Sequence, residues 1–395
     1  MNTFDFTLPT KVYFGPGRID DIGDILNNYG YKTIFLVTGS KSLKKSGAFD
    51  RLVGSLTKHN ITYILYEGVK PNPDISYVKE GLEKLKTLEK IGGKHVDILL
   101  ACGGGSVMDV AKSIAVNYFY DGDPLDFSKH LAVPTKALPV ACIPTIFGSG
   151  SEGSDSCVIS SYEDDFKQGF NSPLVRPKFC ILDPELTATV PERQLAAGII
   201  DMMMHSMERY FTGNEFALSD AFAFSVIKNA MNNGLRLFKD KEDKEARASL
   251  MADSFFSHNG LTSFGKKFSF IIHPLEHALS ALKPEITHGL GVGVVFLGWA
   301  KYVYLSQLDK FSTFSHEVFN LTIEDKMESS IMGIKAWENF LKELQAPTSL
   351  RELGITGDDI NEIVRIATED GTHVIGQGSL SLKASDVQAI YRLVL

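Results

Sequence analysis

Four side chains of metal-binding type stand out in the second half of the chain. Asp201 and His205 occupy positions i and i+4 of AAGIIDMMMHSMERYF, so a helix would point both toward one spot. His273 and His288 follow in stretches that also read as helix. One carboxylate and three imidazoles suit Fe(II), Zn(II) or another first-row ion, and four protein ligands leave a position open for a substrate oxygen. The pattern predicts a Lewis-acid metal centre.

The ordinary interpretation of each histidine has to be weighed against this one. A lone helical histidine is usually a surface or core residue, and i,i+4 pairs often arise by chance. Here five of the 10 histidines fall between residues 205 and 288, and His277 stands four residues after His273 in HPLEHALSAL. His288 opens the segment HGLGVG, whose small residues let other atoms approach closely. The combination favours a metal site over scattered structural histidines.

The predicted secondary structure that would position these residues changes once along the chain, from alternating strands and helices to helices alone. From about residue 30 to 183, apolar runs such as KTIFLVTG, VDILLACGGGS and LPVACIPT alternate with amphipathic stretches such as VKEGLEKLKTLEKI. Continuous apolar strands alternating with helices are typical of a parallel sheet covered on both faces. After Asp183-Pro184, long helical patterns follow. We therefore expect an α/β dinucleotide-binding domain at 1–184 and an all-helical metal-binding domain at 185–395, with a ligand cleft between them.

Two glycine-rich segments would lie at the carboxyl ends of predicted strands, where parallel sheets bind nucleotides. The first, Gly103-Gly104-Gly105-Ser106, follows VDILLAC and opens the helical stretch SVMDVAKSIAV. Glycines let backbone N–H groups approach an anion, and a helix N-terminus adds partial positive charge. The alternative is a tight turn in which Ser106 and Asp109 form a capping box. The second segment, FGSGSE at 147–152, is a weaker signal, and the strict GxGxxG pattern is absent.

The end of the first predicted central strand, LVTGSKS, bears on the type of nicotinamide cofactor. NAD sites commonly place an acidic residue there for the ribose 2′-hydroxyl, but this chain has Gly39, Ser40 and Lys41. These residues leave space, a hydroxyl and a positive charge for a 2′-phosphate, which favours NADP. The alternative is a surface turn with a solvated lysine.

Composition argues against several classes of protein. The 395 residues are enough for two full-sized cores, and a net charge of -8 without a dense Lys/Arg patch argues against binding to nucleic acid or anionic membranes. We find no long apolar run and no basic-then-apolar leader, so we expect a cytoplasmic protein. The cysteines lack CxxC spacing and are expected to be buried free thiols: Cys102, Cys142, Cys157 and Cys180.

The motifs, taken in order, resemble those of the iron-containing (group III) alcohol dehydrogenase family. The resemblance is carried over nearly the whole chain by FGPG, Pro71-Asn72-Pro73, GGGSVMDVAK, IPT followed by GSGSE, ILDPEL, DMMMH and HPLEHALSAL followed by HG. The segment GSKSLKKSG is most similar to the branch of butanol dehydrogenases and NADPH-dependent aldehyde reductases. The resemblance implies a Rossmann-like N-terminal domain, a helical C-terminal domain as in dehydroquinate synthase-like proteins, and a divalent metal in the cleft beside the nicotinamide.

The same resemblance implies roles for individual residues. The matching metal ligands are Asp201, His205, His273 and His288. Together with Gly39, Ser40 and Lys41 from the strand end described above, the candidate cofactor-binding residues are Asn72, Gly103, Gly104, Gly105, Ser106, Asp109, Thr145 and Ser149. The candidate catalytic residues are His277, Asp109 and Lys167, of which His277 matches a histidine that lies near the nicotinamide without binding metal. Homodimers are common in the family, and an exposed strand around residues 10–14 could pair across such a dimer.

The chain departs from the family pattern at three places. His277 and His288 are eleven residues apart, one more than is usual, so the turn LKPEITH has to accommodate an extra residue before His288. Pro274 is comfortable only in a first helical turn, and we therefore expect a helix to begin near His273. Phe147 and Ser149 replace a small residue and a threonine in the second glycine-rich segment, where Phe147 could narrow the cleft.

Together these features predict a metal-dependent alcohol dehydrogenase or aldehyde reductase that uses NADP(H) in preference to NAD(H), with Fe2+ or Zn2+. The ion would polarise the carbonyl of a small aldehyde that receives hydride from the nicotinamide, and His277 would help to supply the proton because an imidazole titrates near neutral pH. A glycerol-dehydrogenase-like polyol enzyme is the nearest alternative. Others are a non-redox cyclase of the dehydroquinate synthase type, whose ligands include Glu where this chain has Asp201, and a non-catalytic nucleotide-binding protein.

Overall fold

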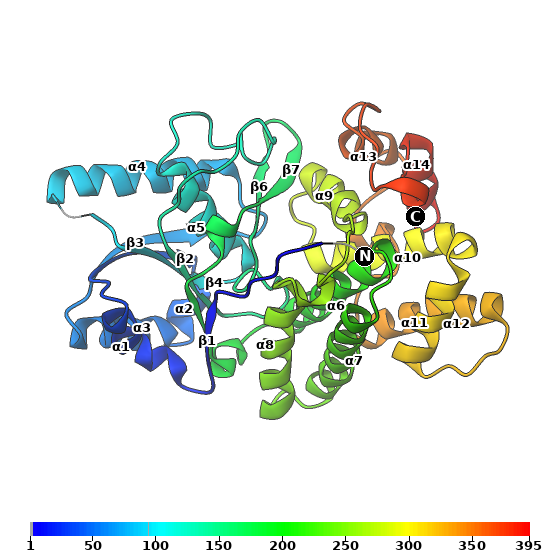
Figure 1. Ribbon diagram of the computed structural model, residues 1–395, viewed down its shortest axis with the longest axis horizontal. Coiled ribbons are helices and arrows are strands. Elements are labelled where there is room, and N and C mark those ends of the chain that lie inside the picture. Colours follow the sequence, from blue (N-terminus) through cyan, green and yellow to red (C-terminus); the bar gives the residue numbers. More distant parts are fainter. Residues whose placement is uncertain (1–2, 94) are drawn as a thin grey trace.

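The N-terminal part of the protein is built on a parallel sheet, as the computed structural model of residues 3–93 and 95–395 describes it (Figure 1). The sheet has six strands in the order β1-β8-β5-β4-β2-β3. The strands are β1 (Lys11–Phe14), β2 (Thr33–Gly39), β3 (Thr62–Val69), β4 (Ile98–Gly103), β5 (Val140–Pro144) and β8 (Phe179–Leu182). Helices between them are α1 (Ile22–Asn28), α2 (Ser42–Lys45), α3 (Ala48–Lys58), α4 (Ile75–Gly92) and α5 (Gly105–Asn117). The predicted fold class is confirmed.

The continuous apolar strands are buried on both faces because successive side chains point in opposite directions. In β2, Ile34 and Leu36 belong to the core that includes α1 and α3, whereas Phe35 and Val37 pack with α4 and α5. The chain adds β3 on one side of β2 and β4 on the other. The strand order therefore reverses between β2 and β4, and sheets of this kind bind dinucleotides at the carboxyl ends of the strands beside such a reversal.

A further pair of strands lies outside the predicted parallel sheet. β6 (Ser156–Ser161) and β7 (Phe166–Asn171) form an antiparallel hairpin. β6 packs on α5, and β7 packs on a helix of the C-terminal part. The sequence pattern does not predict this hairpin because a strand covered on one face has a weaker apolar signal than a central strand. The hairpin brings Lys167 to the cleft between the domains.

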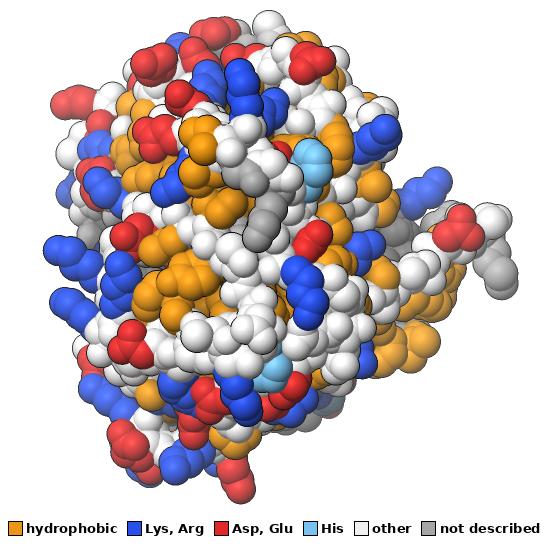
Figure 2. Space-filling view, turned by 90° about the vertical axis from the view of Figure 1, so that its left-hand side faces the viewer, with side chains coloured by type: hydrophobic (Ala, Val, Ile, Leu, Met, Phe, Trp, Pro, Cys, Tyr) orange, Lys and Arg blue, Asp and Glu red, His pale blue; other side chains and the backbone are white. Residues whose placement is uncertain are grey.

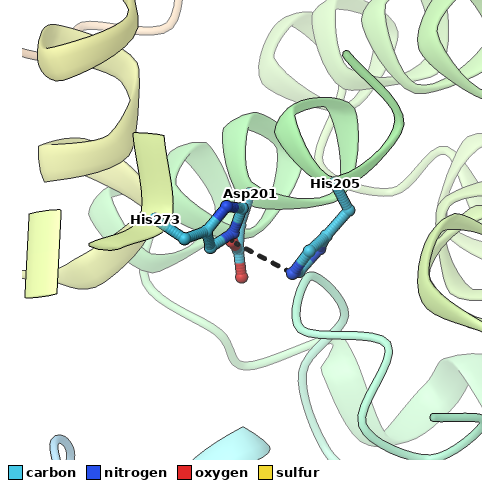
Figure 3. Close-up of side chains that lie close together, drawn as sticks. All are labelled: Asp201, His205 and His273. Carbon is cyan, nitrogen blue, oxygen red and sulfur yellow. Dashed lines mark ion pairs between the residues drawn. The ribbon is translucent and has the colours of Figure 1, made fainter. Parts of the chain in front are cut away.

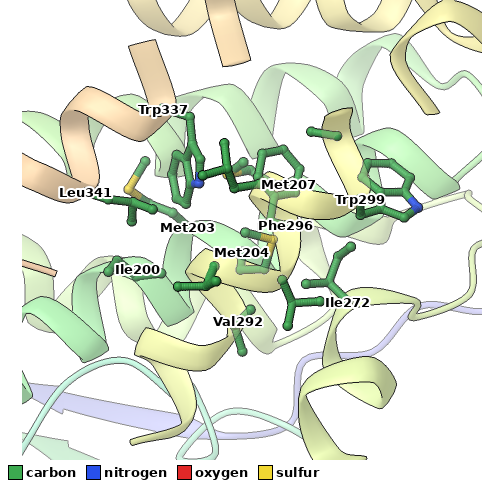
Figure 4. Packing of buried hydrophobic residues seen from close by; sticks show 14 of the residues in the cluster. Ile200, Met203, Met204, Met207, Ile272, Val292, Phe296, Trp299, Trp337 and Leu341 are labelled. Carbon is green, nitrogen blue, oxygen red and sulfur yellow. The ribbon is translucent and has the colours of Figure 1, made fainter. Parts of the chain in front are cut away.

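From residue 192 onward the protein is mainly helical. The helices are α6 (Glu192–Thr212), α7 (Ala217–Lys239), α8 (Lys244–His258), α9 (Ile272–Leu282), α10 (His288–Val303), α11 (Leu308–Phe319), α12 (Lys326–Glu343), α13 (Ile360–Ala367) and α14 (Ala384–Arg392). Side chains of α6, α10 and α12, such as Met203, Phe296 and Trp337, interlock in its core (Figure 4). The segment His288–Ser306 is apolar enough to cross a membrane by length and composition, but 72% of it is buried inside the protein. It is therefore a core helix.

The described residues before β1 run from the sheet toward the helical domain (Figure 1). The rings of Phe4 and Phe6 pack edge-to-face on Phe264, with centroids 4.7 and 5.0 Å away. Residues assigned to the first domain by sequence thus contact the second. The four cysteines are buried free thiols, as predicted. On the face of the N-terminal domain drawn in Figure 2, acidic and basic side chains are interspersed with exposed hydrophobic ones.

Candidate metal and cofactor site

Three helices of the C-terminal domain bring one aspartate and three histidines together. Asp201 and His205 lie one turn apart on α6, His273 lies in the first turn of α9, and His288 begins α10. The Nε2 atoms of His205, His273 and His288 lie 4.0, 3.5 and 3.7 Å from Asp201 Oδ1. Figure 3 shows the side chains of Asp201, His205 and His273 converging from two helices. The structure therefore gathers all four predicted ligands around one point.

The polar atoms of this cluster fit a bound cation. Asp201 Oδ1 and His273 Nε2 are buried, and neither has a hydrogen-bond partner among the residues that the structure describes. Leaving such atoms unpaired is costly, so their presence points to a group that they would bind. One carboxylate oxygen and three imidazole nitrogens form a donor set for Fe(II) or Zn(II).

Close packing of α6 and α10 places His288 beside Asp201. A Cβ atom on Gly289 would lie 2.0 Å from the carbonyl oxygen of Ala197, so glycine is needed for α10 to begin this near to α6. α9 begins at Ile272, one residue before His273, which puts the proline that follows it in the first turn, as predicted.

The histidines differ in their electrostatic surroundings. Burial lowers the pKa of His205 well below its usual value. Burial also opposes the charging of His273, but the carboxylates of Glu208 and Asp201 raise its pKa to about 9. Without an ion, the His273 ring is therefore positively charged at neutral pH, with a proton on each ring nitrogen. A bound cation would replace the proton on Nε2.

His277 lies beside this cluster and lines the cleft. Its ring centroid is 5.4 Å from that of His288 and 6.5 Å from that of His273. Burial and the charge of Lys167 lower the pKa of His277 well below its usual value, so the neutral ring is favoured at neutral pH. The expectation that His277 titrates near neutral pH is therefore wrong. A neutral imidazole still carries one donor and one acceptor nitrogen and can relay a proton.

A second compact group of possible ligands adjoins the first and consists of Glu276, His277 and His288. Within it, Glu276 Oε2 accepts a hydrogen bond from His288 Nδ1. The other ring nitrogen of His288 faces Asp201. His288 therefore belongs to the cluster around Asp201, and Glu276 accepts a hydrogen bond from its other ring nitrogen, Nδ1.

Lys167 and Asn72 form a polar bridge between the two domains. Lys167 Nζ donates to Asn72 Oδ1 at 3.0 Å and to Ser280 Oγ at 2.7 Å. The Asn72 amide donates to the carbonyl oxygens of Pro284 and Ile286, in the turn between α9 and α10. Asn72 thus supports the turn that contains the extra residue before α10, and both Asn72 and Lys167 line the cleft.

The cleft between the domains has a volume of about 1790 Å³. The predicted site residues that line it are Asn72, Gly105, Ser106, Asp109, Ser149, Lys167, Asp201, His205, His273, His277 and His288. The predicted cofactor residues outside this lining are Gly39, Ser40, Lys41, Gly103, Gly104 and Thr145. Thr145 pairs with the first glycine-rich turn, its N–H donating to Gly103 O at 3.0 Å.

The first glycine-rich segment forms the turn from β4 into α5. The alternative interpretation, a capping box formed by Ser106 and Asp109, is wrong, because the N-cap residue is Gly104 and no side chain of the described residues caps the helix. Asp109 instead accepts hydrogen bonds from Ser151 Oγ at 2.9 Å and from Val158 N at 3.3 Å. Burial raises the pKa of Asp109 to about 6. The uncapped first turn of α5 suits an anion such as the cofactor pyrophosphate.

The second glycine-rich segment is held by a buried lysine that the sequence pattern does not single out. Lys112 on α5 is fully buried, and its Nζ donates to the carbonyl oxygens of Ser151, Ser154 and Ser156 at 2.7, 3.0 and 2.9 Å. A lysine inside an apolar helix, as in GGGSVMDVAK, is the available sequence signal. Lys112 therefore fixes the path of this loop beside the cleft.

The same loop contacts the helix that carries two candidate ligands. A Cβ atom on Gly198 would lie 2.2 Å from Phe147 O, so the loop packs directly on α6 about one turn before Asp201. The Phe147 side chain borders the cleft but is 1% exposed and belongs to the helical core. The loop also contacts α8, where His258 Nδ1 lies 3.1 Å from Ser149 O.

The candidate residues for cofactor choice lie at the end of β2 and the start of α2. Ser40 and Lys41 are exposed. A Cβ atom on Gly39 would lie 3.8 Å from a methyl group of Val107, in the first turn of α5. The segment is therefore adjacent to the glycine-rich turn, where a cofactor extending out of the cleft would pass.

Comparison with known proteins gives matches along the full chain. A family model described as iron-containing alcohol dehydrogenase matches residues 9–184, and one described as the C-terminal part of the same family matches residues 195–395. NADH-dependent butanol dehydrogenase A of Clostridium acetobutylicum is 38% identical over 99% of both chains. NADPH-dependent aldehyde reductase YqhD of Escherichia coli is 29% identical over 95% of this chain and 96% of its own. The crystal structure of NADH-dependent butanol dehydrogenase A from Thermotoga maritima has a TM-score of 0.93, at 35% identity, and covers 100% of this chain and 99% of its own.

Proposed function

Since the chain belongs to the iron-containing alcohol dehydrogenase family, as its motifs predict, we propose that it interconverts small aldehydes and primary alcohols with a divalent metal and NADP(H). It is an oxidoreductase acting on CH–OH groups, and the relatives named above are butanol dehydrogenases and an aldehyde reductase. The single observation that carries the proposal is the convergence of Asp201, His205, His273 and His288 in the cleft that also exposes the glycine-rich turn.

The chemistry divides between the two sides of this cleft. A divalent ion held by the four ligands would supply Lewis acidity toward a carbonyl oxygen, and the nicotinamide would supply hydride. The chain itself fixes the distance between these two sites, because the second glycine-rich loop packs on α6 next to Gly198.

His277 and Lys167 are the groups placed to serve proton transfer and positioning. His277 is neutral at physiological pH, so it would pass a proton inward from solvent or from a cofactor hydroxyl. Lys167 is held by hydrogen bonds to Asn72 and Ser280, lies 3.6 Å from Glu276 Oε2, and lines the cleft. Replacing His277 by Ala should therefore change the pH dependence of kcat, while metal content is retained.

Preference for NADPH is the finer part of the proposal. It is supported by Gly39, Ser40 and Lys41, none of which is the acidic residue that NAD sites commonly place at this strand end. Relatives of higher identity carry names with NADH, which makes NADH the competing cofactor to test.

The test is the oxidation of NADPH and of NADH with butyraldehyde, followed by loss of nicotinamide absorbance. Chelator-stripped protein is assayed after reloading separately with Fe(II) and with Zn(II). We expect metal-dependent turnover with the higher kcat/KM for NADPH. A higher kcat/KM for NADH would overturn the cofactor preference alone, and no turnover with either cofactor at full metal loading would overturn the reaction. Oxidation of glycerol in preference to butanol would instead favour a polyol enzyme.

A further inference from the structure

Two of the candidate metal ligands are backed by buried glutamates. His273 Nδ1 donates to Glu208 Oε2, and His288 Nδ1 donates to Glu276 Oε2. Glu208 is 1% exposed and Glu276 is fully buried. In both histidines the opposite ring nitrogen, Nε2, faces Asp201.

Glu208 is fixed by the backbone as well as by the histidine. It lies two turns beyond Asp201 on α6, and its Oε1 accepts hydrogen bonds from the N–H groups of Ile271 and Ile272 at 2.7 and 2.5 Å. These two residues lead directly into His273 at the start of α9. One carboxylate thus sets both the position of the helix and the orientation of its ligand.

Glu276 differs from Glu208 in that its partners among the described residues are side chains and not backbone N–H groups. Its Oε2 accepts from His288 Nδ1 and also lies 3.6 Å from Lys167 Nζ, which comes from the other domain. Its Oε1 has no hydrogen-bond partner among the described residues. Glu276 therefore meets a ligand on one side and the lysine beside the cleft on the other.

His205 differs from His273 and His288 because no carboxylate of the described residues accepts a hydrogen bond from its Nδ1. Its Nδ1 is buried without a hydrogen-bond partner in the described part of the chain. The ring is instead held by packing, at 4.1 Å from the ring of His258 and 4.6 Å from that of His273. Hydrogen bonds thus fix the ring orientation at His273 and His288, and neighbouring rings fix it at His205.

We propose that Glu208 and Glu276 are positioning residues that lock His273 and His288 in the orientation and tautomer in which Nε2 is the metal-binding atom. An ionised carboxylate has no hydrogen to donate and can only accept, so it keeps the histidine proton on Nδ1 and leaves the Nε2 lone pair for the ion. The proposal rests on the metal centre of the proposed function. It assigns neither glutamate to the ligand set.

The two glutamates should respond differently to replacement by glutamine. In Glu208→Gln, the oxygen has to stay on the two backbone N–H groups, so the amide NH₂ would face His273 Nδ1. That contact favours the tautomer with hydrogen on Nε2, which cannot bind metal through that atom. In Glu276→Gln, the oxygen can stay on His288 Nδ1 because the other oxygen position, that of Oε1, accepts from no donor of the described residues. Glu208→Gln is therefore the more damaging of two nearly isosteric changes.

The experiment measures metal affinity without turnover. Stripped wild-type protein and the variants Glu208→Gln, Glu276→Gln and Glu276→Ala are titrated with Co(II) in competition with a chromophoric chelator. The Co(II) absorption spectrum reports the ligand geometry, and circular dichroism reports folding. We expect Glu208→Gln and Glu276→Ala to weaken Co(II) binding by about 10 to 100-fold and to alter the spectrum. Glu276→Gln should weaken binding the least.

Asp253→Asn serves as the matched control. Asp253 is likewise buried and accepts a hydrogen bond from Asn229 at 2.6 Å, but it is bonded to no candidate ligand. The control should leave affinity and spectrum unchanged. Folded Glu208→Gln with wild-type affinity and spectrum would overturn the positioning role while leaving the proposed function intact. Failure of wild-type protein to bind Co(II) would contradict the metal centre itself, and with it this proposal.

Discussion

The proposed metal centre is built mainly from side chains, whereas the proposed cofactor cradle is built mainly from backbone. The metal centre is made of side chains that three helices of one domain present to a common point. The cradle is made mainly of backbone, in the turn after β4 and the loop at 147–152, and Lys112 holds that loop from behind. Removal of one side-chain ligand should abolish metal binding. A site made of backbone groups should instead lose affinity gradually when the side chains that hold its loops in place are changed. Variants should therefore separate ion binding from cofactor binding, except where the two regions touch.

Removal of a ligand should have the largest effect. We expect His205→Ala to lose stoichiometric metal and to lower kcat/KM by about 10³-fold or more, because a catalytic ion contributes several kcal/mol to the transition state. NADPH affinity, measured by the fluorescence of the bound cofactor, should be nearly unchanged. His316→Ala, which removes a ring that is 61% exposed on α11, is the control. Joint loss of metal and cofactor binding would contradict the separation.

A change where the second glycine-rich loop contacts α6 should impair both metal binding and cofactor binding. Gly198→Val would press a side chain against Phe147 O, and overpacking of this kind costs about 1 to 3 kcal/mol of unfolding free energy. We expect lower metal content and a higher KM for NADPH in the same variant, measured together with denaturant unfolding. Gly54→Val is the matched control, because a Cβ atom at that helical glycine meets nothing within 4 Å. Impairment of only one region by Gly198→Val would show that the contact does not couple them.

Loss of the lysine under the loop should affect the cradle alone. Lys112→Met removes the donor to three carbonyl oxygens, and each buried acceptor left unpaired costs about 1 to 3 kcal/mol. We expect a higher KM for NADPH together with normal metal content. Lys266→Met, whose side chain is equally buried but contacts Arg209 and Asp220, should lower stability without changing KM. Metal loss in Lys112→Met would contradict this assignment.

The two regions should also differ in their response to pH. The ion has to displace the proton of His273, whose carboxylate neighbours outweigh the effect of burial and raise its pKa to about 9. Metal affinity should therefore increase about tenfold per pH unit up to that value, while NADPH affinity follows a different profile.

The metal-free protein should show the opposite trend in stability. Because the folded pKa of His273 lies above the ordinary 6.5, its stabilising contribution is complete below 6.5 and is lost as the pH rises through about 9. Unfolding free energies of metal-free protein across this range, with His273→Gln for comparison, test the effect. Equal slopes in the two proteins would exclude His273 as the source.

The smallest effect is expected at the edge of the cradle. Lys41→Ala should lower the ratio of kcat/KM for NADPH to that for NADH by about tenfold, since a charge-assisted hydrogen bond contributes about 1.5 kcal/mol. Lys45→Ala, in the last turn of α2, is the control. An unchanged ratio in Lys41→Ala would remove Lys41 from cofactor selection.

The same contrast explains which features could be predicted from sequence. Central strands such as Ile98–Gly103 are recognisable because both faces are buried and the apolar run is continuous. The spacing of Asp201 and His205 is recognisable because one helical turn brings both side chains to one face. That His273 and His288 lie beside these two residues depends on how three helices pack. Helix periodicity does not predict this packing, and the resemblance to the family does.

Supports for the site were harder to predict. One of the two interpretations of the motif GGGSVMDVAK made Asp109 a cap of its own helix, but the hydrogen-bond partners of Asp109 are Ser151 and Val158, far along the chain. Glu208 and Glu276 sit among ordinary helical residues, and only the fold places them against ring nitrogens. Helix periodicity identifies faces but cannot identify hydrogen-bond partners between elements that are distant in sequence.

The central claim is that one ion, held by Asp201 and the three histidines, is required for reduction of an aldehyde in this cleft. The most direct measurement titrates stripped protein with Fe(II) or Zn(II), following bound metal and NADPH-dependent reduction of butyraldehyde in the same samples. The account predicts that both saturate together at one ion per chain and that His205→Ala abolishes both. Full turnover in metal-free protein would contradict it.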